Sequence, residues 1–183
     1  LIYVLLNRKD NETTAAALAP KLGYSTMTLS RVFNELESVE LAESASIGRQ
    51  RVLHFPTNGQ ETWRRAQQWL INPVKSRHFV VGHPQGLRAG QQALADYTML
   101  AESHRPVIAI SHKQWQSFRN TELAIELQGL EEANYEVEVW KYEPRQYIRP
   151  RLVDPLSLYL TIEQSGDERV EQALEDLMEQ IQW

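Results

Sequence analysis

Two short stretches of the chain gather side chains suited to binding a polyanion. The first carries hydroxyl, amide and guanidinium groups in close succession, at Ser25, Thr26, Thr28, Ser30, Arg31 and Asn34. The second follows a glycine and consists of Arg49, Gln50 and Arg51. A guanidinium can fork onto a phosphate or onto guanine, and hydroxyl and amide groups hydrogen-bond the edges of bases. The residue types therefore predict contact with a nucleic acid, if the fold presents both stretches outward.

The distribution of charge points the same way. Residues 1–78 contain ten Lys and Arg against seven Asp and Glu, a balance of +3, whereas residues 79–183 contain nine against seventeen, a balance of −8. A basic half joined to an acidic half predicts that the first meets a polyanion and the second has another role. The alternative is chance clustering of charge in two ordinary domains.

Residue patterns typical of enzymes and metal sites are missing from the sequence. There are no cysteines, which excludes disulfides, thiolate metal sites and cysteine nucleophiles. Asp154 and the pair Asp167-Glu168 could be paired carboxylates for a metal, but Asp-Pro commonly starts a turn and acidic residues favour helix N-termini, so we prefer a structural role. No phosphate loop or dinucleotide fingerprint occurs. The i, i+4 spacing of a helical metal site is lacking at His78, His83, His104 and His112. We expect no enzymatic activity, no cofactor and no bound metal.

Helices are predicted around the first polar stretch. The run Leu1–Asn7 reads as the end of a helix, and Ala15–Leu22 as a short helix capped by Thr13 or Thr14, its last turn bent at Pro20. Gly23 is a stop signal, and Ser25 caps a further helix over residues 26–38. The buried face of that helix is expected at i, i+3, i+4 and i+7, namely Leu29, Val32, Phe33 and Leu36.

A hairpin is predicted around the second polar stretch. Residues 46–51 centre on Gly48 and lead into the β-rich run Arg51–Phe55, so strand, glycine turn and strand follow in order. Two helices joined by a short glycine-containing turn form a helix-turn-helix, whose second helix places its N-terminal part in the major groove. An arginine-tipped hairpin beside it could reach a phosphate or the minor groove.

These segments, taken in order, resemble a bacterial winged helix-turn-helix regulator of the broad MarR-like group over residues 1–71. The residues that carry the resemblance are Gly23–Arg31, Asn34–Glu37 and Gly48-Arg49. The resemblance implies DNA contacts from Ser25, Thr26, Thr28 and Arg31 in the recognition helix and from Arg49 and Arg51 in the wing. The sequence departs from the pattern at Glu40, where such proteins usually carry glycine. The alternative is a winged helix that is purely structural or binds protein.

A helix is predicted from Gly59 to Ile71, capped by Thr57 or Asn58, and Asn72-Pro73 would end it. One face would carry Trp63, Ala66, Gln67 and Leu70, with Trp69 near it. The tryptophans could serve a dimer interface or pack within their own domain. We place the boundary after this helix, giving domains at 1–72 and 79–183.

The second half alternates between strand-like and helical segments. Strands are expected at Phe79–Val81, Pro106–Ser111, Tyr135–Tyr142 and Leu156–Ile162, and helices at Gln91–Ala101 and Asp167–Trp183. The predicted fold class is therefore α+β, an N-terminal winged helix-turn-helix followed by a small mixed α/β domain. Residues 90–100 and 106–111 are also similar to the C-terminal domain of AbiEi-type antitoxins, which join a winged helix to a larger domain and repress their own operon.

Two functions follow as expectations. The first is a transcriptional repressor that binds double-stranded DNA as a homodimer through helix 25–38 and the basic wing 46–51, while residues 79–183 bind a small ligand or a protein, or dimerise. The second is an antitoxin or protein-interaction module that uses the acidic domain. No apolar run approaches the ~20 residues of a membrane helix, so we expect no membrane contact and a cytoplasmic protein. Because the chain begins at Leu1, we also expect a preceding segment in the complete protein.

Overall fold

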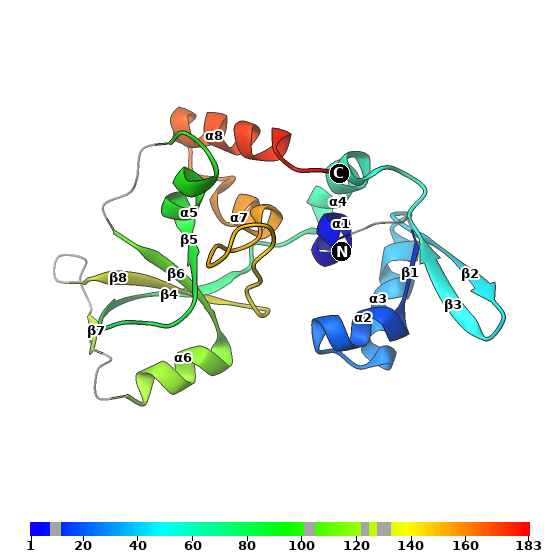
Figure 1. Cartoon of the computed structure of the whole chain (residues 1–183), viewed down its shortest axis with the longest axis horizontal. Coiled ribbons are helices and arrows are strands. Elements are labelled where there is room, and N and C mark those ends of the chain that lie inside the picture. The colour runs from blue at the N-terminus through cyan, green and yellow to red at the C-terminus, as the bar shows by residue number, and fades with distance from the viewer. Residues whose placement is uncertain (8–11, 101–104, 122–124, 128–132) are drawn as a thin grey trace. The chain divides into compact units, whose positions relative to one another are not determined.

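The computed structural model describes residues 1–7, 12–100, 105–121, 125–127 and 133–183. The chain divides into a first unit, Leu1–Leu70 with Trp183, and a second unit, Ile71–Gln182. Each unit combines helices with an antiparallel or mixed sheet, so the fold is mixed α+β (Figure 1). Among the described residues, every helix is either too short or too polar to cross a lipid bilayer.

In its described residues, the first unit contains four α-helices and a three-stranded antiparallel sheet in the order β1-β3-β2. The helices are α1 (Ile2–Asn7), α2 (Ala15–Leu22), α3 (Thr26–Ser38) and α4 (Gly59–Ala66). The strands are β1 (Glu12–Thr14), β2 (Glu43–Ile47) and β3 (Gln50–His54). Strand β1 was not predicted from the sequence.

Local signals set the ends of α2 and α3. The Thr14 hydroxyl oxygen accepts from the Ala17 N–H at 3.1 Å, and Gly23 ends α2 with a φ of 72° while its N–H donates to the Ala19 carbonyl. The Ser25 hydroxyl oxygen accepts from the Thr28 N–H at 3.1 Å and begins α3. Both predicted helices are confirmed, with Pro20 accommodated inside α2.

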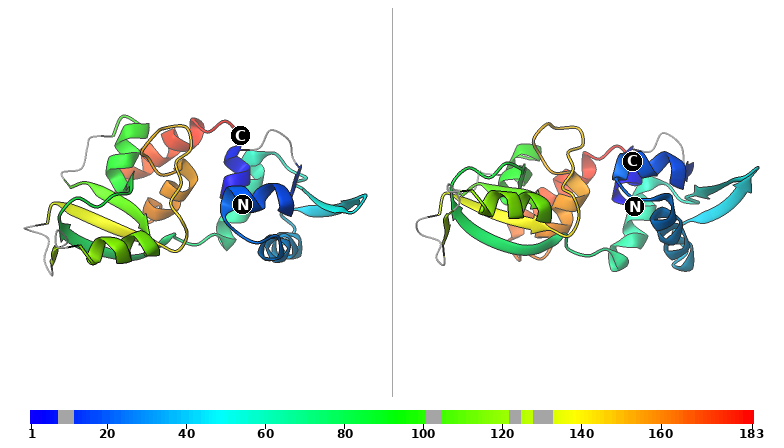
Figure 2. Two further views of the ribbon diagram at one scale, coloured as in Figure 1. Left: turned by 60° about the horizontal axis from the view of Figure 1, so that its bottom comes forward. Right: turned by 90° about the horizontal axis from the view of Figure 1, so that it is seen from below.

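Strands β2 and β3 form a hairpin that projects from the rest of the first unit (Figure 2). Ile47 pairs with Gln50, which leaves a two-residue loop of Gly48 and Arg49. Gly48 has a φ of 62°, a conformation that glycine adopts without the steric cost of a side chain. The predicted strand, glycine turn and strand are confirmed.

The predicted helix over residues 59–71 is wrong beyond Ala66. Asn58 caps α4 as expected, but the chain tightens into a 3₁₀ turn, η1 (Gln67–Trp69), and Leu70 is extended. Pro73 disfavours helical backbone at Asn72 alone, so it does not explain the exit that is complete by Leu70. Trp63 is buried, whereas Trp69 is 58% exposed.

The second unit contains a five-stranded sheet in the order β5-β6-β8-β4-β7. Strands β6 and β8 are parallel and all other neighbours are antiparallel. The strands are β4 (Val74–Val81), β5 (Leu87–Ala89), β6 (Val107–Ser111), β7 (Ile125–Leu127) and β8 (Tyr135–Trp140). Helix α6 (His112–Arg119) covers one face, and α5 (Gly90–Tyr97), α7 (Pro155–Ile162) and α8 (Glu168–Glu179) lie on the other (Figure 1).

The largest difference from the sequence analysis is α7, because residues 156–162 were predicted to be β-rich. Asp154 caps this helix and Pro155 occupies its first turn, where a missing N–H costs little. Every residue of α7 except Tyr159 is buried. A helix surrounded by core has no polar face, so its apolar run carries no helical period.

Strands β5 and β7 and helix α6 were not predicted from the sequence. The remaining differences concern where elements begin and end. Strand β4 begins at Val74 rather than at Phe79, and α8 ends at Glu179 rather than at Trp183. Helix α5 ends at Tyr97, and the expected end of that helix, Ala101, lies outside the described residues.

Candidate nucleic-acid interface

Helix α3 has one buried face and one outward face. Leu29 and Phe33 are 3% and 2% exposed and join a core with residues of α2, β3 and the segment after it. On the opposite side, positions i, i+4, i+7 and i+11 form a stripe of exposed residues. This outer stripe consists of Met27, Arg31, Asn34 and Ser38.

The first turn of α3 is polar and well capped. Besides its capping bond, the Ser25 Oγ lies 2.9 Å from the Thr28 Oγ1, and the Ser30 hydroxyl donates to the Thr26 carbonyl at 2.9 Å. Thr26 and Thr28 are exposed, whereas Ser30 is half-buried. The turn contains no acidic residue, so the partial positive charge of the helix N-terminus is not offset by a carboxylate there.

Two arginines of the predicted site are exposed and unengaged. Arg31 lies on the outer stripe of α3, and Arg49 occupies the loop at the tip of the hairpin. Within the described part of the chain, neither guanidinium takes part in a hydrogen bond or an ion pair. Gln50, the first residue of β3, is exposed beside Arg49.

Arg51 is placed differently, because its guanidinium bonds within the unit. It donates to the Ser44 hydroxyl at 2.8 Å and to the Asn34 amide oxygen at 2.7 Å, and it forms an ion pair with Glu37. Its guanidinium carbon also lies 5.9 Å from the centre of the Phe33 ring. Hydrogen bonds from Ser44 and the nearby Arg51 charge hold the pKa of Glu37 below its ordinary value. Arg51 and Asn34, both predicted to bind DNA, therefore tie the hairpin to α3.

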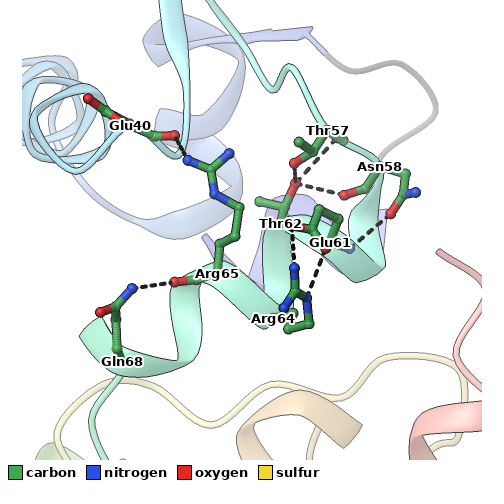
Figure 3. Close-up of polar contacts among 8 residues, drawn as sticks. All are labelled: Glu40, Thr57, Asn58, Glu61, Thr62, Arg64, Arg65 and Gln68. Carbon is green, nitrogen blue, oxygen red and sulfur yellow. Dashed lines mark hydrogen bonds and ion pairs between the residues drawn. The ribbon is translucent and has the colours of Figure 1, made fainter.

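Two further arginines of the basic half are also engaged inside the first unit (Figure 3). Arg64 donates to both carboxylate oxygens of Glu61 at 2.9 and 2.8 Å, and this lowers the pKa of Glu61. Arg65 donates to the backbone carbonyl of Glu40 at 2.6 Å. Glu40 has a φ of 57°, which explains why glycine would suit this position.

Exposed apolar side chains, which were not predicted from the sequence, accompany the polar ones. Met27 on α3 is 67% exposed, Tyr24 before the cap is 49% exposed, and Ile47 at the end of β2 is 61% exposed. The sequence did contain a signal for Met27, because it lies four residues before Arg31 and so shares the same exposed face of the helix. A search restricted to polar and charged residues overlooks this methionine.

The second unit contains an open cavity of about 520 Å³. It lies where the parallel strands β6 and β8 end, a position where α/β sheets commonly bind ligands. Gly86 forms part of the wall, and a Cβ there would lie 2.5 Å from the Ala109 carbonyl oxygen. The polar residues that line the cavity are Gln85, Gln114, Glu143, Arg145 and Gln146.

Of the three carboxylates considered for metal binding, Asp154 and Asp167 are helix caps and Glu168 lies in the first turn of α8. Asp154 accepts from the Ser157 N–H at 2.7 Å at the start of α7, and Asp167 caps α8. Burial raises the pKa of Asp154 to about 6, whereas the hydrogen bonds from Arg169 lower the pKa of Asp167. Among the described residues, no three His, Asp or Glu side chains are grouped so that they could hold a metal ion.

No protein-family model, curated protein or solved structure matches the chain. The features that bear on function are therefore the outer stripe of α3, the arginine at the hairpin tip and the cavity of the second unit.

Proposed function

We propose that the first unit is a winged helix-turn-helix domain that binds double-stranded DNA, and that the protein is a transcriptional repressor. Helix α3 is the recognition helix and the hairpin of β2 and β3 is the wing. The observation that carries the proposal is the pair of exposed, unengaged arginines, Arg31 on the outer stripe of α3 and Arg49 at the hairpin tip.

The remaining predicted residues divide between contact and support. Thr26, Thr28 and Gln50 are exposed and offer hydrogen-bonding groups to bases or phosphates. Ser25 and Ser30 hold the first turn of α3 through its backbone. Asn34 and Arg51 fix the angle between the wing and α3, so their contribution to affinity is indirect.

A single copy presents few unengaged basic groups on this surface, which favours binding as a homodimer. Two copies related by a two-fold axis double the number of phosphate contacts and read a palindromic site. The expected stoichiometry is therefore two chains per duplex, measurable by analytical ultracentrifugation of the complex.

The test is the salt dependence of binding to a fluorescent random-sequence duplex between about 50 and 200 mM salt, because phosphate contacts release counterions. We expect a log–log slope steeper than about −3 for the full chain. Arg49→Ala should make the slope shallower by about 0.9 for each phosphate that this arginine neutralises. Arg64→Ala is the matched control, since that exposed arginine already pairs with Glu61. Absence of binding at the lowest salt would overturn the proposal.

A second role, ligand binding by the second unit, is favoured by the cavity between the ends of β6 and β8. Its lining of amides, one carboxylate and one guanidinium suits a small polar molecule. A thermal-shift screen of such molecules should find compounds that raise the Tm of the wild type but not of Glu143→Trp, which fills the cavity. Compounds that stabilise both proteins equally would contradict binding at this cavity.

A further inference from the structure

Met27 is the apolar exception on the outer face of the first turn of α3. Its side chain is 67% exposed, whereas the other exposed residues of that turn are the short Thr26 and Thr28. Because the two threonines are short, the methionine is the longest side chain in the turn. In a helix-turn-helix, this turn approaches the base edges of the major groove.

The side chains beside Met27 indicate which kind of surface it would contact. Arg31 lies one helical turn further along the same stripe, and its guanidinium is exposed and unengaged among the described residues. Side chains four residues apart on a helix are close neighbours. An apolar group and a cation side by side suit a surface that offers a methyl group next to a phosphate or a guanine.

Thymine is the base that offers such a group, because its 5-methyl projects into the major groove whereas adenine, guanine and cytosine present donors and acceptors there. Methionine is unbranched and polarizable, so it adapts to the position of a methyl group. We propose that Met27 contacts the 5-methyl group of thymine and makes the first turn of α3 selective for that base. This inference rests on the proposed function and names part of the sequence that the recognition helix reads.

The experiment begins by selecting a preferred duplex from a randomised library with the full chain. Each thymine of that duplex is then replaced in turn by deoxyuridine, which differs only by lacking the 5-methyl group. We expect the wild type to lose affinity about fourfold at one or two positions, as for one methyl group left in water. Met27→Ala should bind the parent duplex about fourfold more weakly and should not respond to deoxyuridine at those positions.

The matched control is Met99→Ala, which truncates a methionine that is 98% exposed in the second unit. This variant should keep both the wild-type affinity and the wild-type response to deoxyuridine. Circular dichroism of Met27→Ala checks that α3 is intact, as expected for alanine at an exposed helical position.

The outcomes separate this inference from the proposed function. DNA binding with a normal salt slope, but with no effect of deoxyuridine at any position, would overturn the thymine contact alone. Equal loss of affinity by Met27→Ala on the thymine and deoxyuridine duplexes would do the same. A chain that binds no duplex would overturn the proposed function and the contact together.

Discussion

The two units differ in where their charged side chains lie. The second unit buries two carboxylates, Glu138 at 2% exposure and Asp154 at 5%, and among the described residues these are the buried charged side chains. The core of the first unit is apolar, and its unengaged arginines, Arg31 and Arg49, lie at the surface. Changes at the buried carboxylates should therefore alter the folding of the second unit, and changes at Arg31 and Arg49 should alter binding by the first.

The largest effect is expected from Asp154→Asn. Burial raises the pKa of Asp154 from 3.8 to about 6, so the folded protein holds this proton more tightly than the unfolded chain. This contribution to stability is complete below about pH 4 and is lost as the pH rises through 6, by about 3 kcal/mol in total. The amide keeps the cap, since its oxygen can accept from Ser157. The stability of the variant relative to wild type should rise between pH 4 and 7 in urea unfolding.

Asp167→Asn is the control with the opposite sign. The pKa of Asp167 is lowered by hydrogen bonds from Arg169, so its ionised form favours the folded state at neutral pH. The stability of this variant relative to wild type should fall as the pH rises towards about 4, where the carboxylate ionises, and should stay nearly constant between pH 4 and 7. A pH-independent difference for Asp154→Asn would show that the carboxylate is not held in a costly ionised form.

The next largest effect is expected from Arg77→Met, which removes a partner of the buried Glu138. The Arg77 guanidinium donates to Glu138 at 3.1 and 3.2 Å, and Trp140 donates to the other carboxylate oxygen at 3.1 Å. The cost should be about 2 kcal/mol, less than for a fully buried pair, because the arginine side chain is 48% exposed. The measurement is the free energy of unfolding in urea at pH 7.

The double variant Arg77→Met/Glu138→Gln should recover most of that loss. The glutamine is neutral and its oxygen can still accept from Trp140, so no buried charge is left without a partner. Equal stability of the single and double variants would mean that Arg77 acts through packing alone.

Within the first unit, Arg49 and Arg51 provide a sharper comparison, because they lie two residues apart on one hairpin. Arg51→Ala should lower the Tm, since it removes the bonds to Ser44, Asn34 and Glu37. Arg49→Ala should leave the Tm unchanged and make the salt slope of DNA binding shallower. A reversed pattern, with Arg49 stabilising the fold and Arg51 setting the slope, would contradict the assignment of the two roles.

The contrast between these arginines also shows what the sequence could predict. Helix α3 was found because its signals are local, a cap at Ser25 and an apolar period that places Leu29 and Phe33 inward. The role of Arg51 was not found, because its partners Asn34 and Glu37 lie on another element and only tertiary pairing brings them together. Helix α7 was mistaken for a strand for a related reason, since a helix enclosed by core has no polar face to reveal its period.

The smallest effect is expected from Glu40→Gly, at a position where the sequence itself departs from the winged-helix pattern. Glu40 has a φ of 57°, a backbone conformation that costs a residue with a Cβ about 1–2 kcal/mol of stability. Glycine avoids this strain, but its greater freedom in the unfolded chain lowers stability by about 0.5–1 kcal/mol. The bond from Arg65 reaches the backbone carbonyl and survives the change. The net gain should be about 0.5–1 kcal/mol in urea unfolding, with DNA affinity unchanged. Glu40→Ala retains a Cβ and should not be more stable than wild type. Equal stabilisation by both variants would mean that the glutamate side chain, rather than the backbone conformation, destabilises the wild type at this position.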